Sequence, residues 1–523
     1  MPIDPPSLHE LDSLEEVTMD SVDEIPLESI DEIPLDSMED ETLPPVRRSP
    51  RKPPVRNPKR PTDPSMFPEL PVQDTDMQND VTHPGTISGH STPLSQAWSG
   101  PNQTEAYTPI EPNRLEDLGL SPTFLEHLLL KHLLDFPGQL GRDAASYVCV
   151  NPALVIPLLE GLKRRMLVIH ATGEAAGDFH YDLSEAGRKF ARELRAQNPY
   201  CGPAPVPMEV YRESVNKQSI AHERLQPKDL SKAFHDLMVD PRLLELLGPA
   251  MASGRGVFLF GNSGNGKTSL ALRMSRAYRN SVYIPHAVLM QGQVVQIFDP
   301  QVHRSRPRES YLQAIDRNRL DPRWVRCYRP TVVTGGELTM ESLEMSSNPE
   351  NGISEAPLQV KANCGLLVID DFGRQRIDTE ELLNRWILPL ENRVDYLRLP
   401  NGRKVEVPFD PLLIFSTNLD PAQLVDEAFI RRIPYKVHVP DPSAHVLKNL
   451  LKREAVSMGF NVEEKWLNYI LKHCYESTGR GMRYCHPRDL LLQVKNRCKY
   501  LNEPLELTKE AIDQAAQSYF TLL

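Results

Sequence analysis

The sequence lacks the features of a secreted or membrane-spanning protein. Its 523 residues contain no run of about eighteen apolar side chains, and the N-terminus is acidic instead of carrying an apolar leader. The seven cysteines are scattered, with no Cys-x-x-Cys pair and no zinc spacing, so we expect neither a disulfide framework nor a zinc finger. An odd number of unpaired thiols suits a reducing compartment. We therefore expect a soluble, cytoplasmic protein without membrane insertion.

Residues 1–112 have almost no apolar periodicity and hold 20 of the 48 prolines, so we expect them to form a disordered arm. The first sixty residues carry seven basic and fifteen acidic side chains, which accounts for most of the net charge of −12. The rest of the chain is close to neutral, and its charge does not point to nucleic acid. A short acidic unit occurs twice, as Ser21–Glu28 and Ser29–Asp36. It is interpreted as solvated linker or as a docking tail for a partner.

Residues 115–198 show the order of elements of a small α+β domain. Their pattern predicts helices at Thr123–Asp135, Arg142–Val148, Pro152–Arg165 and Glu185–Ala196, and strands at Met166–His170 and Phe179–Leu183. This order resembles a winged helix-turn-helix domain. The resemblance implies that Pro152–Arg165 enters a DNA major groove with its basic last turn on phosphates. Basic residues there also complement the helix dipole, so DNA contact and protein contact both stay open.

The segment 199–224 is proline-rich at its start and is expected to be a linker. Helical segments such as Asp229–Leu247 follow it. From there to the C-terminus, strand-like and helix-like segments alternate, which predicts a parallel sheet with crossover helices.

The stretch GNSGNGKT, Gly261–Thr268, fits the phosphate-loop pattern G-x-x-x-x-G-K-[ST]. It follows the apolar run Gly256–Phe260 and precedes a helical pattern at Thr268–Tyr278, which is the context that the motif requires. Glycines let backbone N–H groups turn toward phosphates at the positive end of a helix. Lys267 should reach the β- and γ-phosphates, and the Thr268 hydroxyl should bind Mg²⁺. The expected nucleotide-binding residues are Gly261, Asn262, Ser263, Gly264, Asn265, Gly266, Lys267, Thr268 and Ser269.

Two later strands end in polar side chains suited to the same site. Leu366–Ile369 reads as a buried parallel strand, and Asp370 and Asp371 follow it at the end where ligands bind in such sheets. Asp370 would hold Mg²⁺, and Asp371 would orient or deprotonate the attacking water. The strand beginning at Leu412 ends in Asn418, whose amide could place that water or touch the γ-phosphate.

Taken together, these motifs resemble the AAA+ ATPases over residues 225–520. In this resemblance Gly261–Thr268 is like Walker A, Leu366–Asp371 is like Walker B, and Asn418 is like sensor 1. It implies Mg²⁺ and ATP as cofactors. It also implies an α/β P-loop NTPase core at 225–440 and a C-terminal helical lid at 441–523.

The resemblance adds three arginines to the expected site. The expected helix Asp420–Ile433 is similar to the arginine-finger region, so Arg431 or Arg432 would reach the γ-phosphate held by a neighbouring subunit. Arg488, near the start of a later helix, would be the sensor-2 residue.

Three features depart from the family or go beyond its site. Walker B carries Asp370-Asp371 where many members have Asp-Glu, which sets the base carboxylate about one methylene further back. An insertion at 286–360 is expected, with a strand-like Gln293–Phe298 and a helix-like Leu338–Met345. The alternating residues around Asn401-Gly402 predict a β-hairpin. It resembles hairpins that line the pore of a ring, with Arg398, Arg403 and Lys404 at its tip either facing a substrate or solvated.

The resulting expectation is a cytoplasmic AAA+ ATPase that hydrolyses ATP between subunits of a homo-oligomeric ring to remodel or move a protein or DNA substrate. An alternative is a DNA-binding regulator that uses ATP as a conformational switch through its winged helix. A third interpretation is a scaffold protein whose nucleotide site is inactive. The intact set of Lys267, Asp370 and Asn418 speaks against it.

Overall fold

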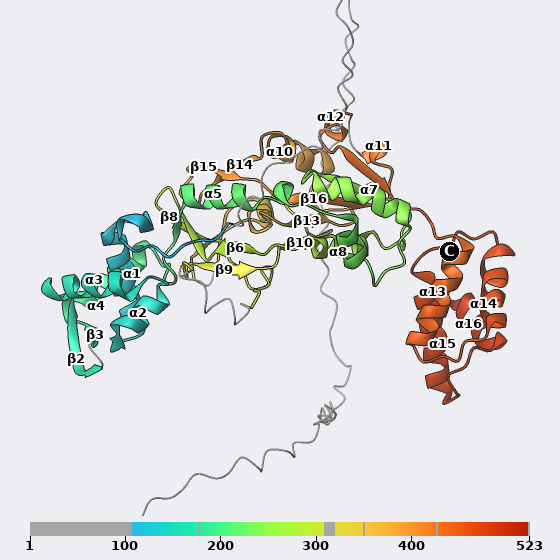
Figure 1. Cartoon of the computed structure of the whole chain (residues 1–523), viewed down its shortest axis with the longest axis horizontal. Coiled ribbons are helices and arrows are strands. Elements are labelled where there is room, and N and C mark those ends of the chain that lie inside the picture. Colours follow the sequence, from blue (N-terminus) through green and yellow to red (C-terminus); the bar gives the residue numbers. More distant parts are fainter. Residues whose placement is uncertain (1–106, 176–177, 308–319, 349–350, 425–426, 521–523) are drawn as a thin grey trace, which may run out of the picture. The chain divides into compact units, whose positions relative to one another are not determined.

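The computed structural model describes residues 107–175, 178–307, 320–348, 351–424 and 427–520, shown in Figure 1. All of them belong to one unit, Ser95–Leu523. Among the described residues, no single helix has the length and apolar character of a membrane span. One bent pair, α2 (Gly141–Tyr147) with α3 (Pro152–Arg164), meets both conditions only when the two helices are taken together.

The centre of the fold is a five-stranded sheet in which each neighbouring pair of strands is parallel. Its strands, in spatial order, are β10 (Thr331–Thr334), β13 (Leu366–Ile369), β16 (Leu412–Thr417), β5 (Val257–Phe260) and β17 (Tyr435–His438). All residues of β13 and β16 are buried, because helices and loops cover both faces of a parallel sheet. The register pairs Ile369 with Phe415 and Thr417 with Phe260, so the carboxyl ends of β13, β16 and β5 meet at one edge. The expected parallel sheet is confirmed.

The membership of this sheet differs from the sequence-based expectation at two strands. β10 lies within the expected insertion 286–360, yet it pairs with β13 in the central sheet. Residues before the expected insertion, which begins at 286, were assigned to the core, but β6 (Val282–Pro285) pairs antiparallel with β9 (Trp324–Cys327) in a separate two-stranded sheet. A four-residue strand carries too little pattern to identify its partner.

Helices α6 (Pro227–Ala233), α7 (Pro241–Ala252), α8 (Lys267–Met274) and α10 (Thr379–Asn392) accompany the central sheet. The expected helix Asp229–Leu247 is wrong, because the chain breaks between α6 and α7, where Asp240 caps the second helix and Pro241 occupies its first position. The expected helix Leu338–Met345 is also wrong. Only a 3₁₀ turn, Glu341–Leu343, forms there, and a short helix α9 (Leu358–Lys361) precedes β13.

The segment expected as a linker, 199–224, contains α5 (Met208–Gln218) and buries Ala204 and Tyr200. Its first residues supply β4 to a second sheet. That sheet runs in the order β11 (Ser346–Ser347), β12 (Ser354–Glu355), β8 (Gln293–Gln296), β7 (Ala287–Met290) and β4 (Val206–Pro207). The end of the expected arm is ordered as well, since Ile110 bridges to Leu320 and the Tyr107 ring lies 5.9 Å from that of Trp324. The remainder of the arm lies outside the described residues.

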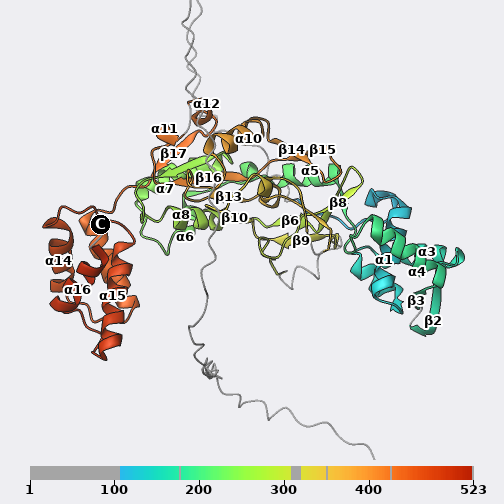
Figure 2. The same cartoon turned by 180° about the vertical axis from the view of Figure 1, so that it is seen from behind.

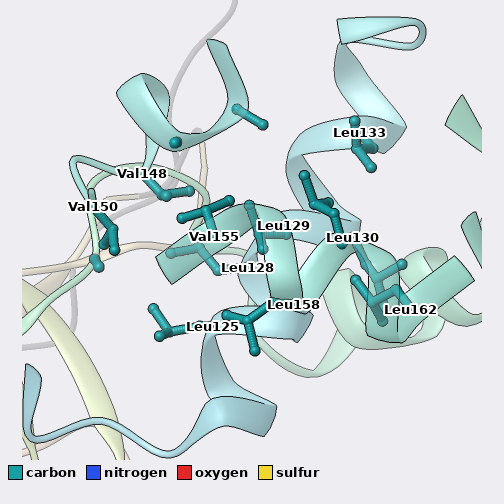
Figure 3. Packing of buried hydrophobic residues seen from close by; sticks show 14 of the residues in the cluster. Leu125, Leu128, Leu129, Leu130, Leu133, Val148, Val150, Val155, Leu158 and Leu162 are labelled. Carbon is teal, nitrogen blue, oxygen red and sulfur yellow. The ribbon is translucent and has the colours of Figure 1, made fainter. Parts of the chain in front are cut away.

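Residues 115–198 form the expected helices and strands in the expected order, with one short strand, β1, that was not expected. They are α1 (Pro122–Asp135), β1 (Gln139–Leu140), α2, α3, β2 (Val168–Ala175), β3 (Asp178–Leu183) and α4 (Glu185–Gln197), with the strands in the order β1-β3-β2. Ser121 and Asn151 cap α1 and α3 through their side chains. In the core, Leu128 and Leu129 of α1 lie near Val155 of α3 (Figure 3). That this unit is a winged helix stays a prediction.

The C-terminal residues form a helical unit with its own core. Its helices are α13 (Ala444–Ser457), α14 (Glu464–Leu471), α15 (His486–Leu501) and α16 (Lys509–Phe520), all labelled in Figure 1, and the last three also in Figure 2. The expected hairpin is present as β14 (Val394–Arg398) and β15 (Lys404–Pro408). Its turn places Gly402 at a φ of 82°, in the left-handed region that glycine adopts without strain.

Candidate nucleotide site

The phosphate loop connects β5 to α8 through three glycines in the left-handed region. Gly261, Gly264 and Gly266 have φ values of 145°, 80° and 76°. A Cβ at Gly261 would collide with the Val439 carbonyl, and one at Gly264 would collide with the Cys485 thiol. Glycine is therefore required here by backbone conformation and by close neighbours at the same time. The N-terminus of α8 begins directly after Gly266, which leaves backbone donors directed toward the loop.

Lys267 joins the phosphate loop to the end of β16. Its Nζ donates to the carbonyl oxygens of Gly261 and Asn262, each at 3.0 Å, and to Asn418 Oδ1 at 2.5 Å. Burial lowers the pKa of this ammonium, and the charges of Asp370 and Asp371 oppose the shift. The lysine is held inside the site by three acceptors, any of which a phosphate oxygen could replace.

The two aspartates after β13 contact the other two elements of the site. The Thr268 hydroxyl donates to Asp370 Oδ2 at 2.7 Å, and Asn418 Nδ2 lies 3.4 Å from Asp371 Oδ1. Asp371 is exposed and adopts a φ of 47°, a conformation that costs energy for a residue with a side chain. The structure therefore brings together Lys267, Thr268, Asp370, Asp371 and Asn418 at the meeting point of three strands. Their catalytic roles stay predictions.

A cavity of about 710 Å³ opens beside these residues, a size that suits a small-molecule ligand. Ser263 through Ser269 line it, as do both aspartates, Asn418 and the predicted sensor-2 residue Arg488. The hydroxyl of buried Ser416, also in the lining, has no hydrogen-bond partner within the described structure. A polar ligand in this cavity would satisfy that group.

The donor set fits a magnesium–nucleotide complex. Thr268 and Asp370 offer oxygen ligands. Among the described residues, no group of three or more His, Cys, Asp or Glu side chains is placed to hold a metal ion by itself. Mg²⁺ commonly binds through one or two protein oxygens, water and substrate phosphates, so this sparse set is sufficient for it.

The C-terminal helical unit touches the phosphate loop directly. The Cys485 N–H donates to the Gly264 carbonyl at 3.0 Å. Tyr484 and Leu450 also line the cavity, so this unit forms part of its wall. The contact fits the position expected of a lid.

Asp441 is a site residue that the sequence reasoning missed. Its carboxylate accepts from Asn262 Nδ2 at 3.0 Å and Asn265 Nδ2 at 2.7 Å, and it pairs with Arg483. Burial alone would raise the pKa of Asp441, but hydrogen bonds from Asn265 and Asn262 and the charge of Arg483 outweigh it and lower that pKa. The available signal was an aspartate flanked by Pro440 and Pro442 immediately after the last strand of the sheet.

Arg431 and Arg432 do not reach this cavity. Of the expected helix Asp420–Ile433, the structure describes helix at Pro421–Leu424 (α11) and Glu427–Ile430 (α12), while residues 425 and 426 lie outside the described residues; the helix ends before Arg431, and both arginines lie in the turn after α12. Arg431 is exposed, and Arg432 Nε donates to Glu391 at 2.7 Å. Their role across a subunit interface stays a prediction.

The hairpin exposes the three basic residues that were expected either to face a substrate or to be solvated. Arg398, Arg403 and Lys404 are exposed. The turn is closed by a hydrogen bond from the Gly402 N–H to the Leu399 carbonyl at 2.8 Å, so the central residues are Pro400 and Asn401 rather than the Asn-Gly pair.

Comparison with known proteins gives one family match and several weak structural similarities. A family model described as a domain of unknown function (DUF8689) matches residues 445–518, and no curated protein matches the chain. The RuvB Holliday junction branch migration motor of Thermotoga maritima is 15% identical over 58% of this chain and 72% of that chain, with a TM-score of 0.31. NtrX from Brucella abortus is 11% identical over 68% and 61%, with a TM-score of 0.33.

These similarities do not assign the chain to a family. The geometry of the chain itself, a parallel five-stranded sheet flanked by helices with a glycine loop leading into α8, fits an α/β P-loop NTPase fold.

Proposed function

We propose that the chain is an AAA+ ATPase that binds and hydrolyses Mg-ATP to remodel or move a macromolecular substrate. One observation carries the proposal. Lys267, Thr268, Asp370 and Asn418 come from three different segments of the chain and are joined by direct hydrogen bonds beside the cavity. An ordinary strand-to-helix turn has no need of such a convergence.

ATP with Mg²⁺ supplies the phosphoanhydride bond that is cleaved. The loop N–H groups bind the phosphates, and Lys267 exchanges Asn418 for a phosphate oxygen. Thr268 and Asp370 would hold Mg²⁺ through oxygen. Asp371 accepts the proton of the attacking water, and Asn418, released from Lys267, orients that water. Because the Asp371 side chain is one methylene shorter than the glutamate of many family members, we expect ATP turnover to be slow.

The site is proposed to be completed by a second copy of the chain. Arg431 is exposed and is absent from the lining of its own cavity, so it is available to a neighbouring subunit. A repeated head-to-tail contact of this kind closes most simply into a ring.

The alternative, a DNA-binding regulator acting through residues 115–198, has weaker support. Two of the three cations at the end of α3 are engaged inside the chain: Lys163 Nζ lies 3.0 Å from His170 Nδ1, and Arg165 pairs with Glu126. Of the three, Arg164 alone remains to contact a phosphate without breaking an existing interaction.

The proposal is tested by steady-state ATP hydrolysis and by binding of a fluorescent ATP analogue. Lys267→Ala should abolish both, whereas Asp371→Asn should retain binding and lose hydrolysis by about 10²–10⁴-fold. Lys499→Ala, an exposed lysine in α15, is the control and should match the wild type. Equal turnover in all four proteins would show that the measured activity arises elsewhere. Tight binding with no wild-type turnover would favour the regulator or the scaffold.

A further inference from the structure

A second cavity, outside the nucleotide site, is surrounded by positive charge. It has a volume of about 1070 Å³ and gathers seven basic side chains from four segments of the chain. They are Lys228 and Lys232 of α6, Arg276 and Arg279 after α8, Arg304 and Arg306 of the loop that follows β8, and Arg329 after β9. α6 and α8 lie side by side in Figure 2, which brings the first four together.

Most of this charge is not neutralised within the described structure. Arg279 pairs with Asp229, Arg276 with Asp236 at 3.2 Å, and Arg329 with Glu223 at 2.7 Å. Lys228, Lys232, Arg304 and Arg306 have no carboxylate within ion-pairing distance among the described residues. Four uncompensated cations around one hollow produce a positive potential that favours a polyanion.

An aromatic ring lies among these cations. Tyr328 follows β9 and is 45% exposed. The guanidinium carbons of Arg304 and Arg306 lie 5.6 Å and 5.3 Å from its centroid. The backbone fixes this group, because the Tyr328 N–H donates to the Arg304 carbonyl at 3.0 Å and the Arg306 N–H donates to the Arg326 carbonyl at 2.8 Å.

We propose that this basic cavity binds single-stranded nucleic acid, with Lys228, Lys232, Arg304 and Arg306 on the phosphates and a base stacked on the Tyr328 ring. A cationic groove combined with an exposed aromatic ring is the arrangement that recognises single strands, because an unpaired base offers its π-face and a duplex does not. An acidic polypeptide would use the cations but would leave the ring without a role. The combination therefore favours nucleic acid over a protein partner.

This inference names a substrate class for the proposed ATPase, but the binding it describes does not require nucleotide. If nucleic acid does not bind, the proposal of an ATP site is unaffected. If ATP is not hydrolysed, the proposal that the basic cavity binds nucleic acid is unaffected.

The test is fluorescence anisotropy of a labelled oligothymidylate of about 16 nucleotides, titrated with the full-length chain without ATP at several salt concentrations. Tyr328→Ala should weaken binding roughly tenfold, and Tyr328→Phe should restore it. Arg304→Gln should weaken binding and reduce the slope of log affinity against log salt by about 0.7, the value for one phosphate contact on a single strand.

A matched control lies in α15, where Lys499 is exposed beside Tyr500, whose exposure is 87%. Lys499→Gln and Tyr500→Ala should leave affinity and salt slope unchanged. Circular dichroism of each variant checks that the fold is retained.

Three results would overturn the proposal: equal affinities for the wild type, Tyr328→Ala and Arg304→Gln; equal affinity for a duplex of the same length; or displacement of the oligonucleotide by polyglutamate at the same charge concentration. The last result would identify an acidic protein as the partner.

Discussion

The nucleotide cavity and the basic cavity differ in whether their polar and charged side chains are paired within the chain. In the first, Lys267 donates to Asn418 and Thr268 donates to Asp370, and beside the cavity Arg483 pairs with Asp441, so apart from the Ser416 hydroxyl the chain satisfies these groups by itself. In the second, four cations lack a carboxylate partner among the described residues. Asp236 connects the two, because it pairs with Arg273 of the first cavity and Arg276 of the second.

The difference indicates two kinds of ligand. A polar site whose groups are already hydrogen-bonded to one another discriminates between ligands, because a ligand must replace each existing hydrogen bond with an equally good one. A site with excess positive charge attracts polyanions broadly, and its affinity falls as salt rises. We therefore expect specific nucleotide recognition in one cavity and tolerant backbone recognition in the other.

The largest expected effect concerns His486, a buried histidine at the start of α15 beside the nucleotide cavity. Burial, together with a smaller contribution from the charge of Arg483, lowers its pKa from 6.5 to about 4, while Asp489 opposes the shift. Its Nδ1 lies 3.1 Å from the Tyr475 hydroxyl. As the pH falls, this histidine takes up a proton in the unfolded chain before it does so in the folded chain. The free energy of unfolding therefore decreases between pH 6.5 and pH 4, by about 3 kcal/mol in total.

Urea unfolding of the C-terminal unit, followed at pH 7 and pH 5, measures this effect. The wild type should lose about 2 kcal/mol more than His486→Gln over this interval. An identical pH dependence in the two proteins would show that His486 is accessible to protons in the folded chain.

The next prediction tests whether the nucleotide cavity binds a metal ion. Thr268→Ala removes the hydroxyl that contacts Asp370, and magnesium-dependent hydrolysis should fall on the order of 10–100-fold. Thr268→Ser keeps the hydroxyl and should recover most of the activity. Nucleotide binding measured with and without Mg²⁺ separates the metal from the phosphates. If Mg²⁺ strengthens binding equally in Thr268→Ala and the wild type, Thr268 is not a metal ligand.

The part of this comparison that sequence could predict is the part encoded locally. GNSGNGKT and the buried run Leu366–Ile369 specify a glycine loop and a parallel strand within a few residues, and the structure has both. Asp441 could not be found in this way, because it meets Asn265 across 176 positions of the chain. The basic cavity was also missed: it is assembled from separate segments, while the near-neutral charge of the body conceals any local excess.

A smaller effect is expected at Asp441, which ties the phosphate loop to the C-terminal unit through Asn265 and Arg483. Asp441→Asn keeps the shape of the side chain but removes the charge, so nucleotide affinity should fall by roughly tenfold, the value of one charge-assisted hydrogen bond. The loss should appear mainly as faster dissociation in stopped-flow measurements, because the contact holds the cavity wall in place. Unchanged dissociation would mean that Asp441 has no part in retaining the nucleotide.

The smallest effect tests whether the two cavities are energetically separate. Arg276→Gln removes one exposed partner of Asp236, but Arg273 Nε still donates to both carboxylate oxygens at 2.9 Å. Exposed ion pairs contribute about 0–1 kcal/mol, so nucleotide affinity should change by less than about twofold. Oligonucleotide affinity should fall severalfold, because a cation of the basic cavity is lost. A comparable fall in both affinities would mean that Asp236 transmits the state of one cavity to the other through α8, and the two sites would then have to be treated as one coupled system.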